Sequence, residues 1–351
     1  TREGGPSANR ILYHADTTGK EIASRLFSRV RKLKNVHIRP YTSLVDILTD
    51  GKECAGGVLR DERTGEIACV YADYVILATG GVGGLYASST NFPQLTGDGV
   101  AICLKHGIAV RDLDYVQIHP TTLYTKRRGR RFLISESVRG EGGVLLDGAG
   151  RRFTDELKPR DVVTAAIRGQ MQKEGSECVW LDMRTIPPEE LRTHFPAIVK
   201  RCLEEGYDPF SRPVPVVPAQ HYFMGGIGSD PEGRTEMPRL FAVGETCCNG
   251  VHGKNRLASN SLLESLLFAR RAALRIGNTY AAVSEETQKR AGQGFDERKY
   301  KDKKALAAEY AELVKAGMER SARERAKKAG KAGAEKPEDA GRAGAARSAA
   351  R

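Results

Sequence analysis

The side chains best suited to chemistry in this sequence are cations, imidazoles and hydroxyls that bind anions. The candidates stand in distinctive local sequences and are His119, Ser135, Arg160, His221 and Arg256. Arg160 falls in the first turn of an expected helix, where the helix dipole opposes a positive charge, so its position indicates a nearby anion. Pairing with Asp161 or Glu156 explains it equally well. A single histidine is more often structural than catalytic, so these residues taken one by one do not define a site.

A loop of small and polar residues that begins at His252 runs into an apolar helix. Ser259, Asn260 and Ser261 are good N-cap residues and predict that the helix begins at this triplet. The N–H groups of a helix start hold an anion or a developing negative charge, and Arg256 lies one turn earlier. An ordinary capped helix beside a solvated arginine is an alternative of equal weight. The buried face of this helix is expected to comprise Leu262, Leu263, Leu266, Leu267, Ala269 and residues 272–274.

Two apolar strands end in small residues. Residues 74–78 run into Thr79-Gly80-Gly81, and residues 240–243 run into Gly244-Glu245. Ligands collect at the carboxyl ends of strands in open α/β sheets, and glycine allows a backbone to approach a cofactor closely. An acid after such a strand can hold the hydroxyls of a ribose or ribityl chain. Each unit alone is also compatible with a turn that binds nothing.

The elements that must position these residues follow an α/β pattern. Helices are expected at about 17–33, 98–106 and 160–172 and from 259 onward. Strands are expected at 36–38, 43–49, 56–60, 67–71, 74–78, 222–226 and 240–243. Polar loops, short helices and short strands between 113 and 222 predict an inserted domain. We divide the chain into a main domain at 1–112, the insertion at 113–222, a return to the main domain at 223–283, and a tail at 284–351. The tail is expected to hold one amphipathic helix at about 302–320, followed by low-complexity basic sequence.

Composition excludes several classes of protein. The 351 residues are 40% hydrophobic and 28% charged, as in ordinary globular proteins, and no apolar run has the length of a membrane span. The net charge of +12 suggests nucleic acid, but half of the excess lies between Glu285 and Arg351, so no nucleic-acid footprint is expected. The seven cysteines contain no C-x-x-C pair, so we expect no metal centre and reduced thiols in the cytoplasm.

Taken together and in this order, the motifs resemble the flavoprotein family of succinate dehydrogenase, fumarate reductase and L-aspartate oxidase. The resemblance runs from residue 1 to about 280. Arg2-Glu3-Gly4-Gly5 followed by Ser7, and residues 14–19 (His-Ala-Asp-Thr-Thr-Gly), are most similar to the L-aspartate oxidases. The dehydrogenases usually carry a glutamine-bearing loop where Glu3 stands. A carboxylate there can orient the ammonium group that distinguishes aspartate from succinate.

The resemblance implies a Rossmann-like FAD-binding main domain with an inserted α+β capping domain. Non-covalent FAD would lie against Ala78, Thr79, Gly80 and Gly81, with Asp98 and Glu245 near its sugar and ribityl regions. Ser261 and Leu262 would present N–H groups to the flavin ring. His119, His221 and Arg256 would bind the carboxylates of L-aspartate or a similar C4-dicarboxylate, with help from Ser135 and Glu3. Arg160 would transfer the proton, and Glu136 and Arg139 could belong to a proton path.

The implied reaction oxidises L-aspartate to iminoaspartate, with oxygen or fumarate reoxidising the flavin. This is the first step of NAD biosynthesis, and the product could pass to quinolinate synthase. We expect a cytoplasmic enzyme that needs neither nucleic acid nor membrane.

The sequence departs from the family in four places. Pro6 replaces a usual histidine, and Ser135 replaces a usual threonine. The N-terminal strand–Gly-x-Gly-x-x-Gly–helix is not found, which predicts a chain truncated at its N-terminus. The usual C-terminal three-helix domain is not recognisable. These departures leave two alternatives beside the main interpretation: a fumarate reductase or succinate dehydrogenase subunit, and an inactive fragment without FAD. A nucleic-acid binder that uses the basic tail is much less well supported.

Overall fold

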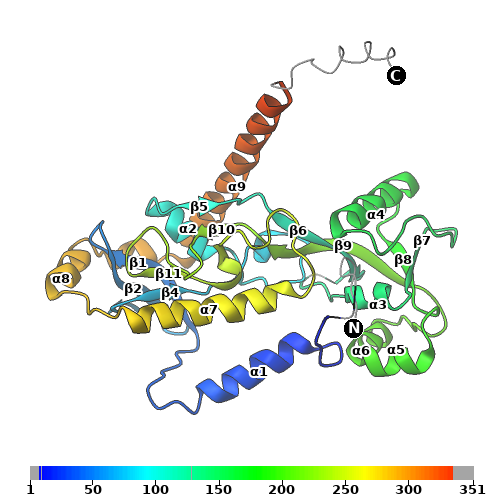
Figure 1. Cartoon of the computed structure of the whole chain (residues 1–351), viewed down its shortest axis with the longest axis horizontal. Helices are drawn as coiled ribbons and strands as arrows, with labels where there is room; N and C mark the ends of the chain where they lie inside the picture. The colour runs from blue at the N-terminus through cyan, green and yellow to red at the C-terminus, as the bar shows by residue number, and fades with distance from the viewer. Residues whose placement is uncertain (1–7, 9, 128, 335–351) are drawn as a thin grey trace, which may run out of the picture.

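A computed structural model describes residues 8, 10–127 and 129–334. Two regions lie side by side, and the C-terminal part of α9 projects away from them (Figure 1). The helices are α1 Thr18–Val30, α2 Asp98–Lys105, α3 Glu136–Gly140, α4 Arg160–Glu174, α5 Pro188–His194, α6 Pro196–Glu204, α7 Asn260–Asn278, α8 Glu285–Gln293 and α9 Lys303–Ala334. Short 3-10 turns are η1 Gly83–Leu85, η2 Gly244–Thr246 and η3 Glu297–Tyr300.

The first region is built on three small sheets. β1 (Thr42–Thr49), β2 (Cys54–Asp61) and β3 (Ile67–Tyr71) pair antiparallel in that order, as the hairpin signals in the sequence predict. β4 (Val75–Leu77) pairs in parallel with β11 (Leu240–Ala242). β10 (Gly226–Gly228) lies between β12 (Cys247–Cys248) and β5 (Val110–Arg111). One apolar core joins these sheets to α2 and α9. The fold is α/β.

The second region lies between residues 116 and 223 and has its own sheet and core. Its strand order is β6 (Val116–Leu123), β9 (Val214–Phe223), β8 (Val179–Asp182) and β7 (Val144–Leu146). Val163 and Ile167 of α4 pack into this core, whereas Val162 is 43% exposed. α5 and α6 begin at Pro188 and Pro196, and in the sequence Pro187 and Pro196 predict helix starts or breaks at these points.

Three local predictions are wrong. Residues 36–38 form no strand, and Val36 and Ile38 are exposed. β4 is a strand but is not fully buried, because Ile76 is 46% exposed. The buried residues of α7 are Glu264, Phe268 and Ala272, whereas Leu263 is 67% exposed and Leu262, Leu266, Leu267 and Leu274 are also exposed. An apolar stripe shows which face prefers burial, but it does not supply an element that covers it.

A buried ionic cluster attaches the C-terminal elements to β1. Asp46 accepts hydrogen bonds from Lys105 Nζ and His106 Nε2, both at 2.7 Å, and from the Tyr300 hydroxyl at 2.8 Å. Burial alone would raise the pKa of Asp46, but the hydrogen bonds from His106, Lys105 and Tyr300 outweigh it and hold the pKa at about 2. The cluster therefore fixes α2 and η3 against the antiparallel sheet.

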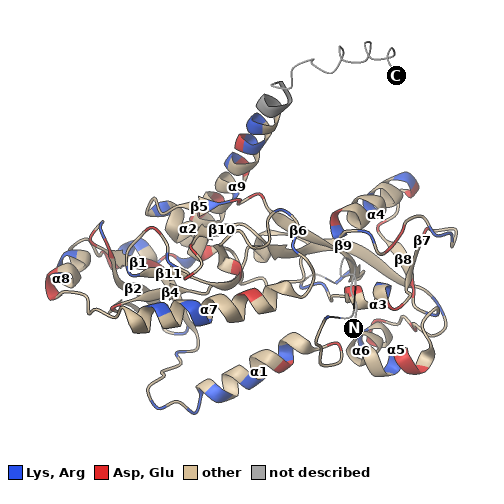
Figure 2. Cartoon of the chain, viewed as in Figure 1, with Lys and Arg blue, Asp and Glu red and all other residues tan. Residues whose placement is uncertain are grey.

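Charge is distributed without a single dominant patch. Figure 2 shows Lys and Arg interspersed with Asp and Glu over both regions and along α9. Within the described residues, no helix is both long enough and apolar enough to cross a membrane. The seven cysteines are free thiols.

Candidate active site

The two strand–glycine units meet at one edge. β4 and β11 pair with Leu77 opposite Ala242, so their carboxyl ends lie together and bring Gly81 against Glu245. A Cβ at Gly81 would lie 2.5 Å from Glu245 Oε1, so a larger residue there would displace the Glu245 carboxyl group. Units far apart in the sequence therefore form one edge, of the kind that binds cofactors in α/β sheets.

The other residues expected at this edge also lie near the carboxyl ends of β4 and β11. Thr79 Oγ1 lies 2.8 Å from Thr246 Oγ1, and Gly99 in the first turn of α2 packs against Thr79. Asp98 opens α2 and accepts a hydrogen bond from the Thr96 hydroxyl at 2.6 Å. Ala78 is exposed, and Gly80 has a left-handed φ of 75°, so the backbone here is open to a ligand.

Glu245 is an unusual acid at this edge. Its Oε1 accepts a hydrogen bond from the Phe223 N–H at 2.9 Å. Burial raises the pKa of Glu245 to about 7, although the Phe223 N–H opposes the rise. The carboxyl group is thus partly protonated near neutral pH, and it can donate to a hydroxyl or accept from one.

The helix start at the end of the loop occurs where the sequence predicts it. α7 begins at Asn260, and Ser259 occupies the N-cap position. Ser259 has a left-handed φ of 64° and makes no side-chain cap, which differs from the expected cap geometry. Ser261 accepts a hydrogen bond on its hydroxyl from Arg256 Nη1 at 3.2 Å. The first turn of α7 therefore carries both an N–H cluster and an arginine.

The two candidate arginines are joined through one amide. Arg160 Nη1 donates to Gln117 Oε1 at 2.8 Å, and Gln117 Nε2 donates to the backbone carbonyl of Arg256 at 2.7 Å. All three residues are buried. Burial, with repulsion from Arg160, lowers the pKa of Arg256 to about 10. Gln117 is not among the site residues that the sequence predicts, although it stands two residues before His119.

The two histidines face each other across β6 and β9. Their ring centroids are 5.1 Å apart, and His221 Nδ1 lies 2.8 Å from the Thr90 hydroxyl. Burial and the nearby Arg160 hold the pKa of both imidazoles well below the ordinary value. His119 Nδ1 lies 3.1 Å from the Thr121 carbonyl oxygen and 3.2 Å from the Thr121 nitrogen. Both rings are therefore neutral at pH 7.

Buried acids accompany Arg160. Its Nε donates to Glu136 Oε2 at 2.6 Å, and Arg139 Nη2 lies 3.7 Å from the same oxygen. Arg139 also donates to the backbone carbonyl of Glu156, whose carboxylate binds Arg152. The local anion that the position of Arg160 indicates is thus Glu136, and neither Asp161 nor the Glu156 side chain is its hydrogen-bond partner.

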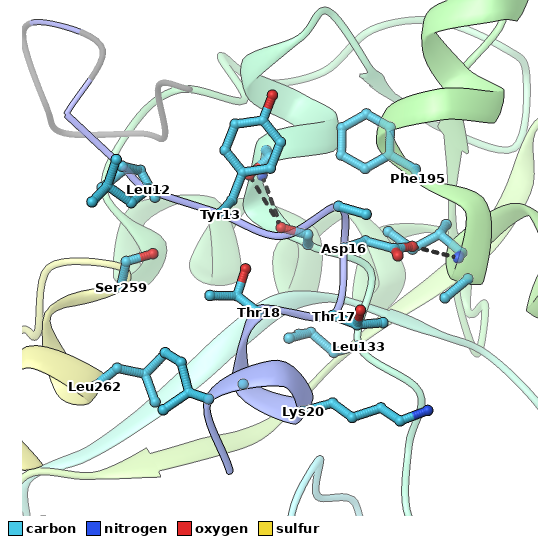
Figure 3. A pocket seen from close by; sticks show the side chains of 18 of the residues that line it. Leu12, Tyr13, Asp16, Thr17, Thr18, Lys20, Leu133, Phe195, Ser259 and Leu262 are labelled. Atoms are coloured by element: carbon cyan, nitrogen blue, oxygen red, sulfur yellow. Dashed lines mark hydrogen bonds between the residues drawn. The ribbon is translucent and has the colours of Figure 1, made fainter. Parts of the chain in front are cut away.

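A cavity of about 1160 Å³ lies beside this cluster. Residues 10–13, the start of α1, the Phe195–Ile198 turn and the first turn of α7 contribute to its wall (Figure 3). Asp16 accepts from the Ile198 N–H at 2.9 Å and ties the N-terminal segment to α6. Ser135 and Leu262 line this cavity, whereas Arg160, Arg256, His119 and His221 are buried outside its lining. Glu3 and Pro6 lie outside the described residues.

Unsatisfied groups identify what the cluster can bind. Within the described residues, His119 Nε2 and Arg256 Nε are buried and have no hydrogen-bond partner. Buried polar atoms without partners are costly, so such atoms point to a ligand. A buried guanidinium and a buried imidazole suit a small dianion, and the strand edge with its glycines suits a dinucleotide. The fold and this site define an FAD-binding flavoprotein.

Comparison with known proteins agrees with this class. The family described as "FAD binding domain" matches residues 1–262. L-aspartate oxidase of Clostridium perfringens is 46% identical over 314 residues, which cover 89% of this chain and 71% of that protein. L-aspartate oxidase of Clostridium acetobutylicum is 45% identical over 81% of this chain and 65% of its own length. The chain belongs to the L-aspartate oxidase family of FAD-binding proteins.

Solved structures of fumarate reductases share the fold. A variant of E. coli quinol fumarate reductase superposes with a TM-score of 0.71 at 32% identity, covering 88% of this chain and 55% of that chain. A quinol-fumarate reductase with menaquinol molecules gives a TM-score of 0.76 at 33% identity over 84% and 55%. The chain thus spans a little over half the length of these reductase subunits.

Proposed function

We propose that this protein, with FAD bound, oxidises L-aspartate to iminoaspartate. The observation that carries the proposal is the pair of orphaned buried donors, His119 Nε2 and Arg256 Nε, beside Arg160. The net change in the substrate is loss of a hydride from Cα and of a proton from nitrogen, which leaves a C=N bond. A dicarboxylate supplies the two anionic groups that such a cluster requires.

Non-covalent FAD fits the strand edge and the helix start. Ala78, Thr79, Gly80 and Gly81 would hold it from β4, with Asp98 and Glu245 at its hydroxyls. Ser261 and Leu262 would offer N–H groups of the α7 first turn, where the helix dipole stabilises negative charge. When bound, FAD supplies the acceptor for the hydride, and oxygen or fumarate reoxidises it.

The substrate carboxylates would bind His119, His221 and Arg256, with the Ser135 hydroxyl assisting. Because both imidazoles are neutral at pH 7, they contribute directed N–H donors, and Arg256 supplies the fixed charge. We assign Glu3 the orientation of the substrate ammonium. These residues bind the substrate, and a different side chain transfers the proton.

Arg160 is the residue that we assign to proton transfer. Its guanidinium is buried, contacts Glu136 and Gln117, and lies in the field of Arg256. Glu136 and Arg139 would continue the proton path towards Glu156.

The proposed product is iminoaspartate, which must pass to another enzyme. Iminoaspartate is an unstable imine, and we propose that quinolinate synthase receives it in the cytoplasm, as the first step of NAD biosynthesis. Neither nucleic acid nor a membrane takes part in this scheme.

The test is reduction of the bound flavin by candidate substrates. The purified chain is incubated with FAD, desalted, and examined by its absorbance spectrum. L-aspartate added without oxygen should bleach the flavin band, whereas succinate at the same concentration should bleach it far less. Bleaching by succinate instead of aspartate would favour a fumarate reductase or succinate dehydrogenase. A chain that retains no flavin would be an inactive fragment.

A further inference from the structure

Glu264 is a buried carboxylate that the proposed mechanism does not use. It lies in the second turn of α7 and is 5% exposed. Its Oε1 accepts from Asn249 Nδ2 at 2.8 Å, and its Oε2 accepts from the Tyr222 hydroxyl at 3.3 Å. His252 Nε2 lies 3.6 Å from Oε2. A buried acid with hydrogen bonds to two other segments needs a reason, since burial of a charge is costly.

One partner of Glu264, Tyr222, contacts Arg256, and the other two belong to the loop that precedes Arg256. The Tyr222 ring lies 4.5 Å from the Arg256 guanidinium carbon, and the His252 ring meets Tyr222 edge-on at 5.6 Å. Asn249 and His252 belong to the loop that leads from β12 to Arg256. Glu264 therefore contacts both the aromatic surface on which Arg256 rests and the loop that carries it.

Arg256 depends on this support because its own hydrogen bonds are long. Its Nη1 reaches Ser261 Oγ at 3.2 Å and the Leu257 carbonyl at 3.4 Å, and its Nε has no partner. Bonds at the long end of the range are weak. The loop is irregular, and Gly250 and Gly253 both have left-handed φ values. Without side-chain anchors, a loop of this kind samples several conformations.

We propose that Glu264 is a positioning residue that sets Arg256 for the substrate carboxylate, through Tyr222 and the 249–252 part of the loop. The inference rests on the proposed function, because it assigns Arg256 to that carboxylate. The same carboxylate stands three residues after Ser261, so one helical turn positions both the N–H groups for the cofactor and the arginine for the substrate. A merely structural Glu264 would change stability and leave the affinity for dicarboxylates unaltered.

The first test is Glu264→Gln in the FAD-loaded protein. Glutamine keeps one acceptor oxygen and replaces the other with a donor that Asn249 or Tyr222 cannot use equally well. We expect the KM for aspartate and the Kd for succinate, measured by calorimetry, to rise about tenfold, with kcat within about twofold and FAD content unchanged. Glu319→Gln on the exposed face of α9 is the matched control and should match the wild type. A succinate Kd within twofold of the wild type in Glu264→Gln would overturn the proposal.

The second test asks whether the effect passes through Arg256. In an Arg256→Lys background, Glu264→Gln should weaken succinate binding by less than twofold, because coupled residues are not additive. Full additivity would contradict the proposal. If Glu264→Gln does not fold, Tyr222→Phe decides: it keeps the ring under Arg256, loses the hydroxyl contact, and should weaken succinate binding about threefold.

Failure of the proposed function is distinguishable from failure of this inference. A wild-type protein that binds succinate but does not oxidise aspartate would refute the reaction, while the calorimetric comparison of variants would still test Glu264. An unchanged succinate Kd in Tyr222→Phe and Glu264→Gln, in a wild type that oxidises aspartate, would refute the role of Glu264 alone.

Discussion

Arg160 donates through Nη1 to the side-chain oxygen of Gln117 at 2.8 Å, and the nitrogen of that amide donates to the Arg256 carbonyl at 2.7 Å. One glutamine on β6 thus sets the relative position of a helix residue and a loop residue. Because Gln117 uses its acceptor on one side and its donor on the other, neither glutamate nor an apolar side chain can replace it. The spacing of the two proposed functional arginines depends on this amide.

Replacing Gln117 by leucine should therefore separate the two arginines without unfolding the sheet. We expect kcat/KM for aspartate to fall about 100-fold, since displacement of a catalytic group by about 1 Å has effects of this size. Steady-state kinetics measure kcat/KM, and circular dichroism shows whether the variant is folded. Gln172→Leu, an exposed position on α4, is the control. A Gln117→Leu enzyme with wild-type kinetics would show that the amide does not matter.

Arg160→Leu should abolish turnover while FAD stays bound. The side chain contacts Glu136 and Gln117, and none of the residues that we assign to FAD contacts it by a hydrogen bond. Flavin absorbance after gel filtration and aspartate-dependent flavin reduction give the two readouts. Arg168→Leu, exposed on the same helix, should retain activity. Retained turnover in Arg160→Leu would remove its assigned role.

Glu245→Gln should change the pH dependence of stability of the FAD-free protein. The pKa of Glu245 is raised from 4.5 to about 7 on folding, so the folded state binds more protons than the unfolded state between these values. The contribution of Glu245 to the unfolding free energy is fully present below pH 4.5 and is lost as the pH rises through 7. The unfolding free energy of the variant should therefore rise relative to that of the wild type between pH 4.5 and 7. Urea unfolding at each pH measures this difference. If the unfolding free energies of the wild type and the variant change in parallel with pH, the raised pKa of Glu245 is contradicted. Glu312→Gln serves as the exposed control.

Asp46→Asn should destabilise the protein without affecting flavin chemistry. The pKa of Asp46 falls from 3.8 to about 2 on folding. A shift of this size corresponds to about 2 kcal/mol of unfolding free energy, present above pH 3.8 and lost as the pH falls through 2. Urea unfolding at pH 7 should show the loss, and acid titration should show the wild type and variant converging. Asp155→Asn is an exposed control that should have no effect.

Local signals in the sequence predicted most of the elements. The hairpin turns of 43–71, the glycine after β4, the prolines before α5 and α6, and the start of α7 at Asn260 each depend on backbone preferences within a few residues. The same signals failed at residues 36–38, where three apolar or neutral residues found no partner strand. A short strand is stable only where another strand pairs with it, and pairing is not a local property.

The candidate residues were recognisable because their types and order resemble a family, but their contacts were not. The sequence suggested Asp161 or Glu156 as the anion beside Arg160, and the structure instead places Glu136 there. The sequence did not predict three further residues of the site, namely Gln117, Tyr222 and Glu264. An amide, a phenol and a glutamate in a helix occur throughout proteins and do not by themselves indicate a site. They become informative only when their partners are known.

The sequence by itself determined the class of most elements, the two strand–glycine units, and the helix start beside Arg256. Tertiary structure alone decided that Gly81 packs on Glu245, that Gln117 links Arg160 to the loop of Arg256, and that the leucines of α7 remain exposed. The physical reason is the range of the forces involved. Backbone preference and periodicity act over a few residues, whereas a buried hydrogen bond or an ion pair depends on strands and helices more than 100 residues apart, such as Gln117 and Arg256.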